Sequence, residues 1–99
     1  MLEQLTSASL AAQLNTKFRL SSEPEKTIEL ELVEVNDNDE VAGQTERFSA
    51  FFRGPLESYL PQRTYGMAHE ELGNFELFIV PIRKDEAGFY YEAVFNRVK

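Results

Sequence analysis

The sequence predicts a mainly β protein, a six-stranded antiparallel barrel or sandwich with one short N-terminal helix. From Thr16 onward, apolar and polar residues alternate with the period of half-buried strands. Turn-forming residues interrupt this alternation at intervals of about ten to fifteen positions. The chain has 99 residues, of which 42% are hydrophobic, including eight Phe. That content suffices for one core and is too apolar for a disordered segment, so we expect residues 1–99 to form a single domain.

The N-terminal helix is predicted over residues 7–14. Thr6 is of a residue type that caps helices, and most of the following residues are good helix formers. Leu10 and Leu14 recur four positions apart and define one apolar face. Two turns of helix are not stable alone in water. We therefore expect this helix to dock on the rest of the domain.

The six expected strands are Lys17–Leu20, Thr27–Val35, Glu46–Arg53, Thr64–Ala68, Asn74–Ile82 and Phe89–Arg97. In the second strand the apolar positions change parity after Leu32, which predicts that either a β-bulge or a stretch with apolar residues on both faces begins there. The fifth strand is apolar at every position from Leu77 to Ile82, so we expect it to be covered on both faces and Phe78 to be buried. Consecutive strands joined by short turns usually lie side by side, which predicts a meander.

Charge and composition exclude several classes of function. A net charge of -7 would repel the phosphates of nucleic acid and of anionic membranes. Without cysteine, disulfides, thiol nucleophiles and cysteine-based zinc sites are impossible. No window approaches the ~20 apolar residues of a membrane-spanning helix, and Glu3 stands where a secretory leader would be basic. We expect a soluble protein in the cytoplasm, with no nucleic acid or membrane as partner.

No group of residues predicts catalysis or a metal site. The acidic run Asn36–Glu40 resembles a calcium loop, but from Asn36 the position that needs Gly is Val41 and the closing Glu is Arg47. A solvated turn fits better than a metal site. His69 is the single histidine, and we expect its ring to hydrogen-bond the following turn. Glu92 is expected to face outward. We predict no catalytic residue, no metal and no cofactor.

Four residues are candidates for contact with a protein partner: Phe51, Arg53, Arg63 and Tyr90. Phe51 and Tyr90 lie on the polar parity of their strands, so each is either covered by the N-terminal helix or part of an exposed apolar patch at an interface. Arg53 and Arg63 lie beside aromatic residues and could bind a carboxylate. Their segments, which contain Gly54, Pro55 and Pro61, could equally serve only as rigid connections.

Several segments together carry a family resemblance: LEQLT at 2–6, FFRGP at 51–55, LPQRTY at 60–65, LFIVP at 77–81 and YEAVFN at 91–96. The chain resembles, over nearly its whole length, a family of small bacterial domains of unknown function. This family is often encoded beside phage-tail-collar-like fibre proteins of the microcystin-dependent-protein type. The resemblance brings no catalytic residue. Arg63 departs from it, because the family is expected to favour Gly there.

The resemblance implies a non-enzymatic accessory or structural protein of a bacterial phage-tail-like fibre system, acting through protein–protein contacts, with a tail-collar-like fibre protein as the partner. The alternative is a small-ligand-binding β-barrel, and an enzyme is the third hypothesis. A packed interior with an exposed apolar patch would favour the first. An internal pocket with convergent polar groups would favour the second.

Overall fold

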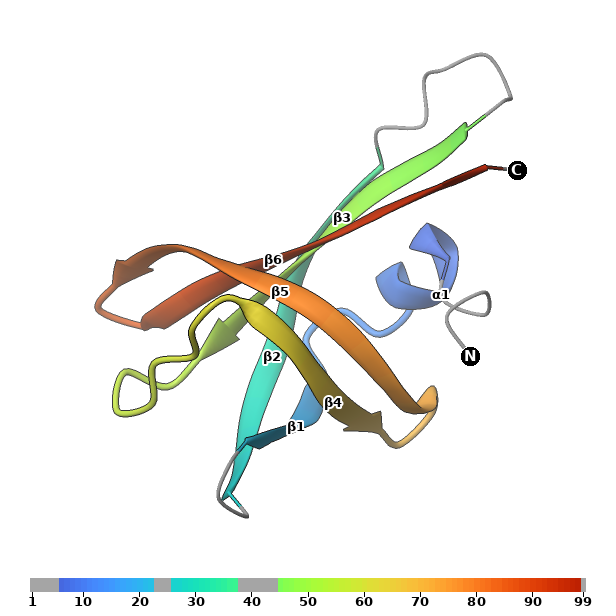
Figure 1. Ribbon diagram of the computed structural model, residues 1–99. Helices are drawn as coiled ribbons and strands as arrows, with labels where there is room; N and C mark the ends of the chain where they lie inside the picture. The colour runs from blue at the N-terminus through green and yellow to red at the C-terminus, as the bar shows by residue number, and fades with distance from the viewer. Residues whose placement is uncertain (1–5, 23–25, 38–44, 99) are drawn as a thin grey trace.

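A computed structural model describes residues 6–22, 26–37 and 45–98 (Figure 1). Its elements are α1 (Ser7–Ala11), β1 (Lys17–Ser22), β2 (Lys26–Asp37), β3 (Thr45–Gly54), β4 (Arg63–His69), β5 (Gly73–Asp85) and β6 (Gly88–Val98). The six strands close into an antiparallel barrel. The predicted fold class is confirmed, and of the two architectures expected the protein adopts the barrel.

The strand order is β1-β2-β3-β6-β5-β4, so the predicted meander is wrong at two places. β3 pairs with β6, and β4 pairs with β1. The reason lies in residues 55–62, which form no hairpin but carry the chain from β3 to β4. The phenol oxygen of Tyr91 accepts a hydrogen bond from the Leu60 N–H at 3.0 Å, and the Tyr65 hydroxyl donates to the Pro61 carbonyl at 2.7 Å. These two bonds hold the connection against the barrel.

Helix α1 begins as predicted and ends earlier. The Thr6 hydroxyl accepts from the Ser9 N–H at 3.0 Å, and the Ser9 hydroxyl oxygen accepts from the Thr6 N–H at 2.9 Å, a capping box. The helix ends at Ala11 instead of Leu14, because turns follow that lead to Asn15 at a φ of 70°. Leu10 is fully buried, whereas Leu14 is 37% exposed.

The barrel interior is filled with large side chains. The largest that are fully buried are Tyr91, Phe18, Phe48, Phe52, Leu10, Leu20, Leu30, Leu32, Leu60 and Ile79. Phe18 packs edge-on against Phe52 with ring centroids 5.2 Å apart, and Phe48 stacks on Phe95 at 4.5 Å. Leu10 of α1 belongs to the same cluster, so the helix docks on the interior, as its length requires.

The prediction that β5 is covered on both faces is wrong. Phe75, Leu77 and Ile79 point into the core, whereas Phe78 is 51% exposed and Val80 is half-buried. A barrel has one interior, so only alternate residues of a strand reach it. Of the two alternatives predicted for β2, the structure has the bulge, which appears as a shift of register between Leu32 and Glu34.

Candidate functional site

Charged and aromatic side chains form a row across the outer face of five strands. Register pairs Lys17 with Glu31, Glu31 with Arg53, Arg53 with Tyr90, and Tyr90 with Arg83. An Arg53 Nη2 donates to Glu31 Oε1 at 2.6 Å. Hydrogen bonds of Arg53 with Tyr90 and with Glu31 raise the pKa of its guanidinium above its ordinary value. Arg53 is therefore fixed between two partners.

Tyr90 owes its low exposure to this row and not to the helix. The guanidinium carbon of Arg83 lies 3.8 Å from the centroid of the Tyr90 ring, a cation–π contact. The residue is 8% exposed. Helix α1 inserts Leu10 into the interior cluster, to which neither Phe51 nor Tyr90 belongs. Tyr90 is thus in neither of the two predicted environments, because it is buried but Arg83 covers it in place of the helix.

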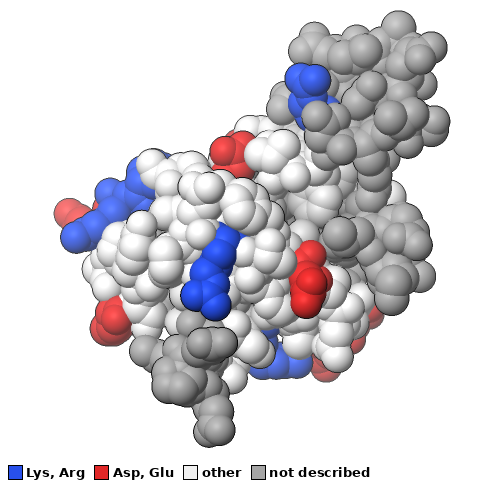
Figure 2. All heavy atoms as spheres, in the orientation of Figure 1, with Lys and Arg blue, Asp and Glu red and all other residues white. Residues whose placement is uncertain are grey.

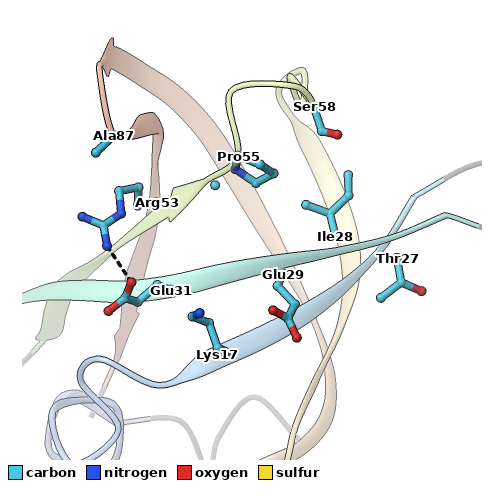
Figure 3. Close-up of a pocket in the computed structure, with 10 residues that line it drawn as sticks. Lys17, Thr27, Ile28, Glu29, Glu31, Arg53, Pro55, Ser58 and Ala87 are labelled. Atoms are coloured by element: carbon cyan, nitrogen blue, oxygen red, sulfur yellow. Dashed lines mark hydrogen bonds and ion pairs between the residues drawn. The ribbon is translucent and has the colours of Figure 1, made fainter.

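A groove of about 450 Å³ opens beside Arg53 (Figure 3). Thr27, Ile28, Glu29 and Glu31 of β2 line one side of it. Pro55 and Ser58, from the connection after β3, line the other side, and Lys17 and Ala87 stand at its margins (Figure 3). The ion pair of Arg53 and Glu31 spans part of the groove, and the Glu31 and Arg53 side chains are 23% and 33% exposed. Both therefore remain accessible to a ligand.

The structure unites three of the four predicted contact residues. Phe51, Arg53 and Tyr90 lie on the outer face of the β3–β6 pair, where Arg53 faces Tyr90 and Phe51 faces Glu92. Arg63 lies apart from them on β4, with its guanidinium carbon 5.3 Å from the Tyr65 ring centroid. Sequence reasoning missed Arg83 and Glu31. The predicted hairpin between the fifth and sixth strands could have indicated Arg83, because its register places Arg83 opposite Tyr90.

Apolar side chains gather on the outer face beside this row. We call Phe51, Phe78, Val80 and Val94 the outer patch. Val80 and Phe51 flank Glu92 from the two neighbouring strands, while Phe78 and Val94 are the next outward residues on β5 and β6. Phe78 is 51% exposed and Val94 is 59% exposed. Charged side chains stand apart on the face over β5, with uncharged surface between them (Figure 2).

His69 ties the β4–β5 turn to the segment before β1, and the local role predicted for it is confirmed. It is 5% exposed, and its ring lies 4.3 Å from that of Phe18. Its Nδ1 accepts from the Glu71 and Leu72 N–H groups at 3.0 and 3.2 Å. The Thr16 hydroxyl donates to the Gln13 carbonyl, so its oxygen accepts from Nε2, 2.8 Å away. These bonds require the neutral ring with its proton on Nε2.

Acidification is expected to destabilise the protein through His69. Burial lowers the pKa of His69, although Glu71 and Glu70 oppose this shift and Arg19 adds to it. The folded state therefore binds this proton less readily than the unfolded chain, and the free energy of unfolding should fall as pH drops below about 6.5. Melting temperatures of the wild type and His69→Gln between about pH 7.5 and 5.5 test this.

His69 is the only histidine, so the wild type should lose stability over this interval while His69→Gln loses markedly less. Equal slopes for the two proteins would show that the ring does not titrate as its surroundings require.

Within residues 6–22, 26–37 and 45–98 there is no cluster of three or more metal-ligating His, Asp or Glu side chains. Residues 38–40 of the acidic run weighed as a calcium loop lie outside the described residues. No helix in the described part of the chain is long and apolar enough to cross a membrane.

Comparison with curated proteins and with solved structures yields no match. A family model does match, from residue 5 to residue 95, which is nearly the whole chain. The protein therefore belongs to the family described as domain of unknown function DUF6916.

Proposed function

We propose that this protein is a non-enzymatic accessory or structural protein that acts by binding another protein. The observation that carries the proposal is a filled barrel whose outer face bears the outer patch. Contiguous exposed apolar side chains on a small domain are typical of surfaces that associate with other proteins. Membership of a family of unknown function is compatible with this role and brings no activity of its own.

The filled interior disfavours the alternative, a small-ligand-binding barrel. Such a barrel needs an interior cavity with a few convergent polar groups. Here Phe18, Phe52 and Tyr91 occupy the interior with no exposure. The Tyr91 hydroxyl is already engaged by the Leu60 N–H. The groove beside Arg53 opens at the surface of the barrel and not into its interior.

The partner we propose is a tail-collar-like fibre protein of a bacterial phage-tail-like system, met in the cytoplasm. The contact surface would be the outer patch, with Phe51 at its β3 side and Arg53 and Tyr90 along its border. Aromatic and Arg side chains often dominate the binding energy of protein interfaces. Arg63, on another part of the barrel, would contribute only to a contact that extends to β4.

Co-purification from the native host tests the proposal. The double variant Phe78→Thr with Val94→Thr should lose the fibre protein that the wild type retains, because it removes two exposed apolar side chains of the outer patch. Threonine keeps the strand propensity of both positions, so the melting temperature should change little.

Leu56→Thr is the matched control, because Leu56 is 44% exposed but lies in the connection between β3 and β4. It should bind the fibre protein as the wild type does. Wild-type bait that retains no fibre protein, or a double variant that still retains it, would refute the proposal.

A further inference from the structure

Strand β2 extends beyond the end of β3. On one side it pairs with β1 from Lys26 to Glu31. On the other side its pairing with β3 starts only at Glu31, opposite Arg53. After Gly54 the chain turns away at Pro55 (Figure 3). Among the residues that the structure describes, no strand pairs with residues 27–30 on this side, so about 13 Å of strand edge is left open.

The peptide groups of this edge point into the groove. The Leu32 N–H donates to the Thr16 carbonyl at 3.2 Å, and the Leu32 carbonyl accepts from the Asn15 N–H at 2.7 Å. Leu32 thus directs both groups toward the β1 side. Because these groups alternate sides along an antiparallel strand, Thr27 and Glu29 direct theirs to the opposite side. Both residues line the groove, where an added strand would find two N–H and two C=O groups.

The charge at this edge selects the occupant. Glu29 is exposed and, within the described part of the chain, forms no ion pair, although Arg19 stands opposite it on β1. Glu31 shares its charge with Arg53 and faces Lys17 on β1. A side chain of an added strand would lie directly beside the Glu29 carboxylate. In a second copy of this chain, the same edge would place like charges opposite one another, and each copy carries a net charge of -7. A basic segment of another protein fits instead.

We propose that the groove binds an extended, basic peptide segment as an added strand on β2. The segment runs along residues 27–30 between β2 and the wall formed by Pro55 and Ser58. Its outward position beside Glu29 carries Lys or Arg, and its inward positions carry small apolar side chains against Ile28 and Pro55. This mode takes affinity from main-chain hydrogen bonds and specificity from alternate side chains. It uses a surface other than the outer patch and does not require a fibre protein.

The test uses the purified full-length protein and a blocked, fluorescent heptapeptide of alternating Lys and Val. Fluorescence anisotropy should show that it binds at least tenfold more tightly than the matched peptide of alternating Glu and Val. Methylation of the backbone nitrogens on one edge of the Lys/Val peptide should weaken binding at least tenfold, because this change removes hydrogen-bond donors and keeps the charge. Hydrogen exchange at the Thr27 and Glu29 amides should slow when the peptide binds.

Variants separate the edge from general charge attraction. Glu29→Lys should weaken binding of the Lys/Val peptide at least tenfold. Glu76→Lys, at an exposed position of β5 outside the groove, makes the same change in net charge and should alter binding less than twofold. Equal effects of the two variants, or full binding of the methylated peptide, would overturn the proposal.

In analytical ultracentrifugation, the free wild-type protein and the Glu29→Pro variant should have the same oligomeric state. Proline at an open edge removes one N–H without disturbing the β1 ladder. A dimer that this variant dissociates would assign the edge to a second copy and would also overturn the proposal. Because none of these measurements involves the outer patch or a fibre protein, their failure would leave the proposed function untouched.

Discussion

Replacing Phe18 with Ala is expected to lower the free energy of unfolding by about 3 to 5 kcal/mol. Phe18 has no exposed surface, and its ring contacts three others, those of Phe52, His69 and Phe75. The two strands beside β1 cannot close on the vacated space without breaking their pairing. The lost burial and the residual cavity therefore both count against the folded state.

Chemical denaturation of Phe18→Ala and Phe78→Ala measures this effect against a matched control. Phe78 is 51% exposed on the outer face of β5, so its truncation should cost at most about 1 kcal/mol. A loss for Phe78→Ala as large as that for Phe18→Ala would mean that the outer face of β5 is buried, and the core assignment would fail.

Gly88→Ala is expected to cost about 2 to 3 kcal/mol. Gly88 adopts a φ of 154°, a backbone conformation that residues with a side chain rarely adopt. A Cβ built on it would overlap the carbonyl oxygen of Gly54, and backbone cannot move aside as a flexible side chain can. The substitution must therefore shift the tip of the β5–β6 hairpin away from β3.

Gly66→Ala is the matched control, since Gly66 lies within β4 and a Cβ there meets nothing within 4 Å. It should change the free energy of unfolding by no more than about 0.5 kcal/mol. Equilibrium unfolding measures the free energy of unfolding of both variants. If Gly88→Ala is as stable as Gly66→Ala, the close approach of Gly88 and Gly54 is not required by the fold.

Local chemistry made most elements predictable. The Thr6 cap, six strands and the bulge after Leu32 follow from periodicity and from turn-forming residues, which act over a few positions. The order of strands could not be predicted in this way, because the β3–β6 and β1–β4 pairings join distant segments. The exposure of Phe78 was missed because an apolar outer face and a second buried face give the same pattern in sequence.

The candidate sites were predictable only in part. Wrong parity correctly indicated that Phe51 and Tyr90 lie outside the interior cluster. The proximity of Arg53 to Tyr90 depends on the β3–β6 register, whereas that of Arg83 to Tyr90 follows from the β5–β6 hairpin. The open edge of β2 could not be predicted from the sequence at all. It exists because β3 stops at Gly54 while β2 starts several residues earlier in register.

Along the chain the barrel consists of two units of three consecutive strands, β1–β3 and β4–β6, and residues 55–62 are the connection between them. Each unit by itself has two edge strands with unpaired backbone groups. The β3–β6 and β1–β4 pairings cover these edges, and both join distant parts of the chain, such as Thr45 with Val98 and Arg19 with Ala68. Such pairings form slowly, because the entropy of closing a long loop is lost before the contacts between the strands can form. Neither half is protected against edge-to-edge aggregation until the other has docked, so the chain gains its protection in one cooperative step.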